Sequence, residues 1–291
     1  MRKFSLLHAL KSGIIYFMAL FLLNSCYDFD QNEGFIGKSV HQNFSGNTIN
    51  TQGGKCVYHP KVYFFMYHYV RDYDQRDTPI THDLSIPPNE FREHMKKVHE
   101  LSESGKISLM NGDSFIEAIR TNCFSHENIW IFSADDGWSD MYSNLYPIIN
   151  EYRIPFFLGV VTDFLDKSGF ISTGELLTMS KNPIVTIASH SVSHIDNSKL
   201  EEAQERHEAC DSKKILERII DKEVYAYIYP SGRINKLIDE RILNECGYSI
   251  AWSTGFGRDY NSSTGSLFNL NRIRIHSGTK KDFFDQLVQG T

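Results

Sequence analysis

Two adjacent carboxylates, Asp135 and Asp136, follow directly after an apolar segment that begins at Ile129. Neighbouring like charges repel one another, so a pair of acids at the end of a buried strand calls for an explanation. Successive side chains of an extended chain point to opposite sides, which allows one carboxylate to bind a metal ion while the other faces a substrate. Gly137 then allows a sharp turn. The alternative is a simple strand-ending turn, because Asp-Gly is a common turn dipeptide.

A second polar group, His190 and His194, follows another apolar segment. On a helical turn, residues four positions apart share a face, so both imidazoles could bind one ion. The spacing alone is weak evidence in a chain with 12 histidines. Together with one of the two aspartates, the pair supplies three ligands, and catalytic zinc sites keep a fourth position for water. These residues therefore predict a divalent metal site, with zinc as the expected ion and the other aspartate as general base.

The elements that must position these residues alternate between strands and helices. Strands are expected at residues 62–67, 107–110, 129–132, 156–161, 184–188, 224–229, 249–252 and 270–275. We also expect a loop over residues 71–88, a helix capped by Asp113, and helices over residues 200–220 and 234–246. Strands that are apolar on both faces and alternate with helices indicate a parallel α/β domain. About seven such units in roughly 235 residues favour a distorted (β/α) barrel over an open sheet. We therefore predict one barrel domain over residues 56–291.

Most of the polar residues of interest come immediately after predicted strands. They are His68, Asp135, Asp136, His190, His194 and the segment Pro230–Gly232. In a parallel barrel the carboxyl ends of the strands form one face, and that face carries the active site. The shared position of these residues is stronger evidence than any single motif.

The first 55 residues differ in character from the rest of the chain. Basic residues precede a short apolar run over residues 14–23, which is typical of a secretion signal and shorter than the ~20 residues of a spanning helix. The run ends at Leu23-Asn24-Ser25-Cys26, which resembles the lipobox of bacterial lipoproteins. We expect a lipoprotein-type signal peptide over residues 1–26, with lipidation at Cys26. A plain signal peptide is the alternative.

Polar residues without periodicity follow, so residues 27–55 are predicted to be a flexible linker. Lipid chains would hold the protein on a membrane of the bacterial cell envelope, facing the periplasm or the cell surface. Four cysteines remain after Cys26 and allow three pairings; they are Cys56, Cys123, Cys210 and Cys246. The formal net charge of -6, without a basic stripe, argues against a nucleic-acid partner.

The two polar groups also resemble the motifs of a known family. Ser133–Gly137 is similar to the Thr-Phe-Asp-Asp-Gly motif of the polysaccharide deacetylases, the NodB-homology or carbohydrate esterase family 4 group. His190–His194 is similar to the family's second motif, which carries two metal-binding histidines. Shorter similarities occur at Phe65–His68, Tyr146–Ile149, Ile154–Phe156 and Tyr229–Arg233. The resemblance extends from Val62 to the C-terminus.

The resemblance implies a role for each matched residue. Asp135 would be the general base, and Asp136, His190 and His194 would bind the divalent ion. The backbone N–H of Trp138 would help to hold the oxyanion. The family has a distorted (β/α) barrel and removes acetyl groups from N-acetylated sugars in a polymer. The metal would activate a water molecule, from which Asp135 would take a proton.

The chain departs from the family pattern at two positions. Ala134 replaces the usual aromatic residue, and Ile228 stands where the family often has an arginine. The Tyr-Pro-Ser-Gly form of this segment is closer to the subgroup that acts on exported poly-N-acetylglucosamine. Arg272 is the expected substitute that orients Asp135, because its segment resembles the late Arg-Ile segment of that subgroup. Arg233 and Arg274 are alternatives.

The general acid is less clearly marked. His276 is a candidate, but an exposed residue after a strand end would give the same pattern. His68 either lines the cleft or caps the first strand. Tyr229 and Trp138 belong to a group of aromatic residues that could contact sugar rings, although core packing explains aromatics at such positions equally well.

These observations predict a metal-dependent hydrolase that removes N-acetyl groups from an envelope or exported polysaccharide. Two other functions remain open. One is a non-catalytic glycan-binding lipoprotein with the same barrel, and the other is a barrel hydrolase of another bond, such as a small amide.

Overall fold

The strands form one parallel sheet, seen in a computed structural model that describes residues 56–235, 238–254 and 266–290. The described strands are β1 (Lys61–Tyr67), β2 (Ser108–Leu109), β3 (Asn128–Ala134), β4 (Phe156–Val160), β5 (Val185–Ser189), β6 (Ala226–Ile228), β7 (Ile250–Trp252) and β8 (Ile273–Arg274). They are ordered β7-β6-β5-β4-β3-β1-β8, with β2 paired to β3. Apart from β2, the neighbouring strands from β1 to β7 therefore follow one another in the order of the chain, as in a (β/α) barrel.

The two ends of this sheet are joined by an irregular segment before β8. Trp252 at the end of β7 forms a parallel bridge with Leu270. The Leu270 N–H donates to Ala251 O at 3.0 Å, and the Ser253 N–H donates to Leu270 O at 2.9 Å. The predicted distorted (β/α) barrel is thus confirmed.

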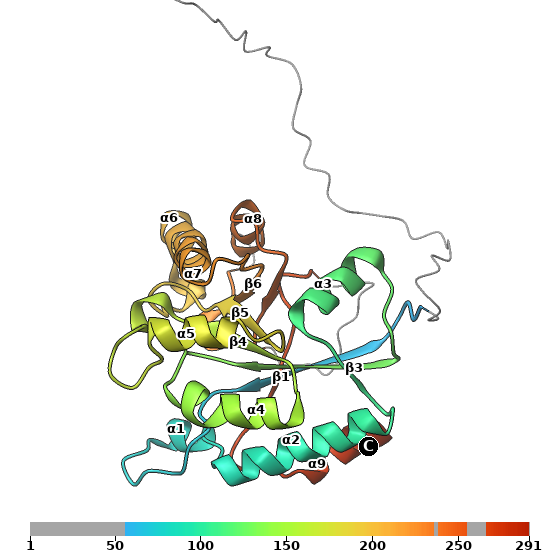
Figure 1. The fold of residues 1–291 in the computed structure, drawn as a ribbon. Helices are drawn as coiled ribbons and strands as arrows, with labels where there is room; N and C mark the ends of the chain where they lie inside the picture. Colours follow the sequence, from blue (N-terminus) through green and yellow to red (C-terminus); the bar gives the residue numbers. More distant parts are fainter. Residues whose placement is uncertain (1–55, 236–237, 255–265, 291) are drawn as a thin grey trace, which may run out of the picture. The chain divides into compact units, whose positions relative to one another are not determined.

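Helices follow most of the strands. They are α1 (Pro79–Asp83), α2 (Pro88–Glu103), α3 (Gly112–Thr121), α4 (Tyr146–Tyr152), α5 (Thr173–Ser180), α6 (Glu202–Arg206), α7 (Ser212–Ile220), α8 (Asp239–Glu245) and α9 (Asp282–Gln289). Two π-helical segments, Met141–Leu145 and His207–Asp211, precede α4 and α7. Figure 1 shows α2, α4 and α9 together on one side of β1 and β3.

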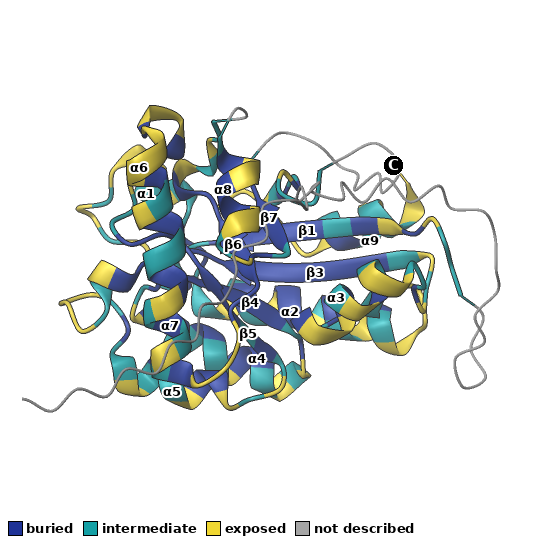
Figure 2. Ribbon diagram, turned by 90° about the horizontal axis from the view of Figure 1, so that it is seen from above, coloured by how far each residue is buried: buried dark blue, intermediate teal, exposed yellow. Residues whose placement is uncertain are grey.

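Both faces of the central strands are buried, as a parallel sheet covered by helices requires. On β1, Phe64 belongs to one hydrophobic cluster and Phe65 to the other. Their neighbours on β3 divide in the same way, with Ile131 in the first cluster and Phe132 in the second. Phe65 lies opposite Phe132 in the sheet register, and their rings stack with centroids 4.7 Å apart. Figure 2 shows the strands buried and the exposed residues on the outer faces of the helices.

Several local details differ from the sequence-based expectations. Helix α1 lies in a segment predicted as a loop. The cap of α3 is Asn111, whose side chain accepts from the Ser114 N–H at 2.9 Å, and not Asp113. Asp113 instead accepts from the Tyr225 hydroxyl at 3.1 Å. Both residue types cap helices well, so only the extended backbone at Asn111 decides where the helix begins.

The long helix predicted over residues 200–220 is also interrupted, because the π-helical segment His207–Asp211 separates α6 from α7. The helix predicted to begin at Ile234 begins at Asp239 among the described residues. Element boundaries of this kind depend on tertiary contacts more than on hydrophobic periodicity.

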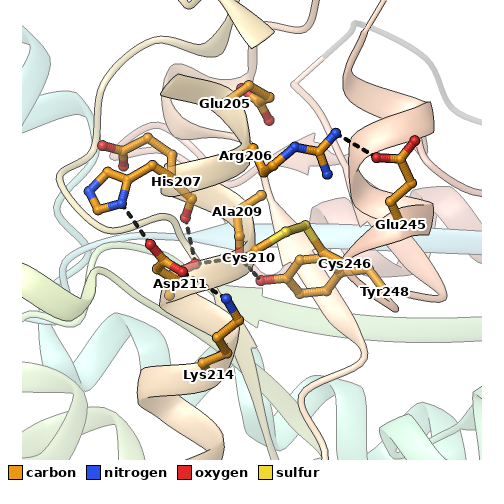
Figure 3. Close-up of a disulfide and its surroundings, with 12 residues drawn as sticks. Glu205, Arg206, His207, Ala209, Cys210, Asp211, Lys214, Glu245, Cys246 and Tyr248 are labelled. Atoms are coloured by element: carbon orange, nitrogen blue, oxygen red, sulfur yellow. Dashed lines mark hydrogen bonds and ion pairs between the residues drawn. A yellow bond between two sulfur atoms is a disulfide. The ribbon is translucent and has the colours of Figure 1, made fainter. Parts of the chain in front are cut away.

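Two disulfides settle the pairing that the sequence left open. Cys56 is bonded to Cys123, and Cys210 is bonded to Cys246. The first joins the segment before β1 to the segment after α3, and the second joins the π-helical segment to the end of α8 (Figure 3). Such bonds form and persist in oxidising compartments.

The expected signal peptide, Cys26 and the linker lie outside the described residues. All described residues belong to one compact unit, Thr48–Thr291. Within them, none of the helices has the length and apolar character needed to cross a bilayer.

Candidate active site

The chain turns sharply after β3, and this turn separates the two aspartates. Asp136 and Gly137 both have positive φ values, 80° and 82°. Glycine adopts this conformation freely, whereas most other residues do so at a cost, with Asp among the better tolerated. As a result Asp135 and Asp136 have different partners. Asp136 also accepts from the indole N–H of Trp138, with its Oδ2 2.8 Å from Nε1.

His190 follows β5 directly and is 2% exposed. Its Nδ1 lies 2.8 Å from the carbonyl oxygen of Ile228. Because a carbonyl can only accept, Nδ1 carries a proton, and Nε2 is the atom that faces Asp136. The oxygen of Ile228 therefore fixes the orientation of a candidate metal ligand, as is usual for ligating histidines.

The conformation predicted for His190 and His194 is wrong, although their proximity is confirmed. Residues 190–196 do not form a helix. Ser191 and His194 have positive φ values of 71° and 62°, and the resulting loop brings the two imidazole centroids to 4.8 Å. The contact depends on an unusual backbone conformation and not on helical spacing.

Asp136, His190 and His194 form a cluster suited to a metal ion. Asp136 Oδ1 lies 3.3 Å from His190 Nε2 and 3.2 Å from His194 Nε2, and the ligand atoms of all three lie within 4.8 Å of one another. Burial opposes ionisation of Asp136, but the two imidazoles hold its pKa well below the usual range. Burial also opposes the charged form of His194 and so lowers its pKa, but the interaction with Asp136 outweighs burial and raises the pKa of His194. A carboxylate facing two imidazole nitrogens requires protons or a cation between them, so the donor set fits a divalent ion.

Asp135 is held by Arg272 in a buried, two-pronged pair. The guanidinium donates from NH1 to Oδ1 at 2.7 Å and from NH2 to Oδ2 at 2.8 Å. The two side chains are 1% and 3% exposed. Burial tends to raise the pKa of Asp135, but the charge of Arg272, followed by that of His190, outweighs this and lowers it. Asp135 therefore remains ionised although it is buried.

The contact predicted between Arg272 and Asp135 is thus present, and the two rival arginines lie elsewhere. Arg233 is 66% exposed and pairs with Asp196. Arg274 is 46% exposed and pairs with Asp83. Ser133 was not anticipated as part of the site: its hydroxyl accepts from Arg272 at 3.0 Å and donates to Phe65 O at 2.9 Å. It lies two residues before Asp135 on the same face of the extended chain, a spacing that could have revealed it.

A pocket of about 1390 Å³ connects most of the predicted site residues. Those that line it are Asp135, Asp136, His190, His194, Arg272, His68, Tyr229 and His276. Trp138 is not among the lining residues, and its side chain holds Asp136. The Tyr229 ring is 1% exposed and its hydroxyl donates to Phe268 O at 2.9 Å. The ring therefore packs in the core and presents no face to a sugar.

His68 and His276, the other two histidines predicted for the site, occupy different parts of this pocket. His68 follows β1, and its buried Nδ1 has no hydrogen-bond partner among the described residues. Burial lowers the pKa of His68, while Asp136 and Asp135 act in the opposite direction. His276 has a side chain that is 46% exposed, with Nδ1 3.6 Å from Asp83. The charges of both aspartates therefore act on His68.

Fold and site together define a parallel barrel with a candidate metal centre at the carboxyl ends of its strands. A family model described as polysaccharide deacetylase matches residues 125–251. YxkH of Bacillus subtilis (strain 168), whose name assigns it to the polysaccharide deacetylases, is 23% identical over 206 residues, 71% of each chain.

Solved structures give the same result for the fold. The deacetylase PplD of Streptococcus pyogenes, in complex with acetate, has a TM-score of 0.69 and 22% identity, covering 78% of this chain and 97% of its own. A de-N-acetylase of Aggregatibacter actinomycetemcomitans has a TM-score of 0.66 and 18% identity, covering 78% and 99%. Residues 125–251 of this chain therefore match the polysaccharide deacetylase family model, and the solved structures described as deacetylases share its fold.

Proposed function

We propose that this protein is a metal-dependent hydrolase that removes N-acetyl groups from an exported or envelope polysaccharide. The observation that carries the proposal is the arrangement of a three-residue metal site beside a buried Asp135–Arg272 pair in one pocket. A carboxylate kept ionised next to a metal site is suited to take a proton from water. The relatives described as a de-N-acetylase and as an acetate complex support an N-acetyl substrate.

In this proposal Asp136, His190 and His194 hold a divalent cation, most simply Zn²⁺. The cation supplies a Lewis acid, which favours attack of water on an amide carbonyl. Asp135 accepts the proton of the attacking water, and Arg272 keeps its carboxylate oriented and ionised. The leaving amine then needs a proton from a neighbouring acid. The backbone N–H of Trp138 remains our proposal for a contact with the developing oxyanion.

The experiment that tests the proposal measures acetate released from N-acetylglucosamine oligomers, with and without a chelator. We expect release by the metal-loaded protein, loss on chelation and recovery when Zn²⁺ is returned. His194→Ala should lower metal content and turnover together, because His194 supplies one of three ligands. A protein that binds the oligomers but releases no acetate would instead be the glycan-binding alternative. Full metal content and turnover in His194→Ala would exclude the site.

We propose His68 as the group that protonates the leaving amine, with His276 as the rival. Both histidines line the pocket. Burial lowers the pKa of His68, but the charges of Asp136 and Asp135 favour its protonated form, and its Nδ1 has no partner among the described residues. His276 is half-exposed, and its Nδ1 lies 3.6 Å from Asp83. His68→Gln should lower kcat about 10²-fold or more while metal binding persists. His276→Gln, the matched control, should change kcat little. The reverse result, with His276→Gln the inactive variant, would assign the acid to His276.

Export and lipidation at Cys26 also remain proposals. The two disulfides support an exported protein, because cytosolic thiols are kept reduced. Membrane fractionation and the N-terminus of the mature protein test the anchor. A soluble mature protein that begins at a residue other than Cys26 would contradict it.

A further inference from the structure

The loop that carries His194 has a backbone conformation that its neighbours must enforce. Ser191 and His194 both lie in the left-handed region, with φ values of 71° and 62°. Non-glycine residues in this region carry a conformational cost and persist only where surrounding contacts determine them. This conformation is what places His194 Nε2 3.2 Å from Asp136 Oδ1. The contacts that hold the loop therefore determine the candidate metal site.

The carboxylate of Glu208 accepts hydrogen bonds from two residues of this loop. Its Oε2 accepts from the N–H of Val192 at 3.0 Å and of Ser193 at 2.8 Å. Its Oε1 accepts from the Ser193 hydroxyl at 2.6 Å. Glu208 is 4% exposed, and hydrogen bonds to a buried charge are stronger than neutral ones. Two successive residues immediately before His194 are thus fixed to a single side chain.

The position of Glu208 follows from the π-helical segment His207–Asp211. The wider turn of a π-helix is found frequently at functional sites, and here it directs Glu208 and Ala209 inward. The segment is also held by the Cys210–Cys246 disulfide and by the Tyr248 hydroxyl, which donates to Ala209 O at 2.7 Å (Figure 3). The backbone segment that carries Glu208 is therefore held in place by a disulfide and a hydrogen bond.

We propose that Glu208 is a positioning residue for the metal site, which holds the Ser191–His194 loop in the conformation that directs His194 toward Asp136. The proposal rests on the proposed function, since it assumes that His194 is a metal ligand. Glu208 does not itself contact the ligand atoms. Removing such a supporting partner typically lowers metal affinity 10- to 100-fold.

Glu208→Gln tests this proposal, because the amide carries no charge and keeps only one oxygen that can accept from the three loop donors. We measure Zn²⁺ affinity of the purified full-length protein by competition with a chromophoric chelator, and the melting temperature in parallel. The expected result is an affinity reduced about 10- to 100-fold. Turnover should be low at limiting Zn²⁺ and recover in excess Zn²⁺, with KM unchanged. A purely structural role would lower the melting temperature without changing the affinity of the folded protein.

Glu205→Gln is the matched control, on the same helical stretch and 0% exposed. Both oxygens of Glu205 accept from the Asn197 side chain at 2.7 Å and from no residue of the loop. Burial, followed by the charge of Asp239, raises the pKa of Glu205 to about 8, so the amide replaces a largely neutral group at pH 7. Its Zn²⁺ affinity should equal that of the unchanged protein.

An unchanged Zn²⁺ affinity in folded Glu208→Gln overturns the positioning role and leaves the proposed function intact. Absence of Zn²⁺ binding by the unchanged protein overturns both. If Glu208→Gln does not fold, Ser193→Ala decides, since it removes only the hydroxyl donor to Oε1. It should weaken Zn²⁺ binding several-fold, and an affinity equal to that of the unchanged protein overturns the proposal.

Discussion

Asp135→Asn is expected to lower kcat about 10²- to 10⁴-fold while the protein still binds Zn²⁺. An amide has no basic oxygen at neutral pH, so it cannot take the proton of the attacking water. The metal ligands Asp136, His190 and His194 are unchanged by this substitution. Acetate release and metal content, measured on the same preparation, test the expectation.

Asp136→Asn is the contrasting control for this experiment. It alters a candidate ligand, so metal content and turnover should fall together. Asp135→Asn also leaves Arg272 buried without its partner, so kcat must be measured well below the melting temperature of each variant. An Asp135→Asn protein with full turnover would exclude Asp135 as the base. One that lost its metal would assign it a place among the ligands.

Arg272→Met is expected to reduce the free energy of unfolding by about 3–5 kcal/mol. The substitution leaves the Asp135 carboxylate, which is 3% exposed, without the guanidinium that compensates its charge. Because Arg272 lowers the pKa of Asp135, the pair contributes stability above pH about 4 and loses it as the pH falls through the folded-state pKa. Chemical unfolding at pH 7 and at pH 3 measures both effects.

The double variant Asp135→Asn/Arg272→Met separates stability from catalysis. It removes both charges, so most of the stability should return, whereas turnover should remain as low as in Asp135→Asn. Arg272→Lys retains a charge without the two-pronged geometry and should also be slow. In Arg272→Met, loss of the guanidinium should shift the acidic limb of the pH–rate profile to higher pH. Unchanged stability and turnover in Arg272→Met would show that the pair has neither role.

Much of the fold and the location of the site could be predicted from the sequence. Apolar strands alternating with helices predict a parallel barrel, because only burial on both faces accounts for strands of that composition. The polar residues after those strands, among them Asp135 and His190, predict a shared site because the carboxyl ends of parallel strands lie on one face. Both inferences depend on local pattern alone.

The details of the site were decided by tertiary structure. His190 and His194 lie close together because two non-glycine residues, Ser191 and His194, adopt the left-handed backbone conformation. Helical spacing does not predict such a conformation. Three arginines were candidates for the partner of Asp135. Arg272, 137 positions later in the chain, is buried against it, whereas Arg233 and Arg274 pair with other residues at the surface. Backbone strain of this kind is stable only where distant groups such as Glu208 enforce it, so it is a property of the packed molecule and not of the local sequence.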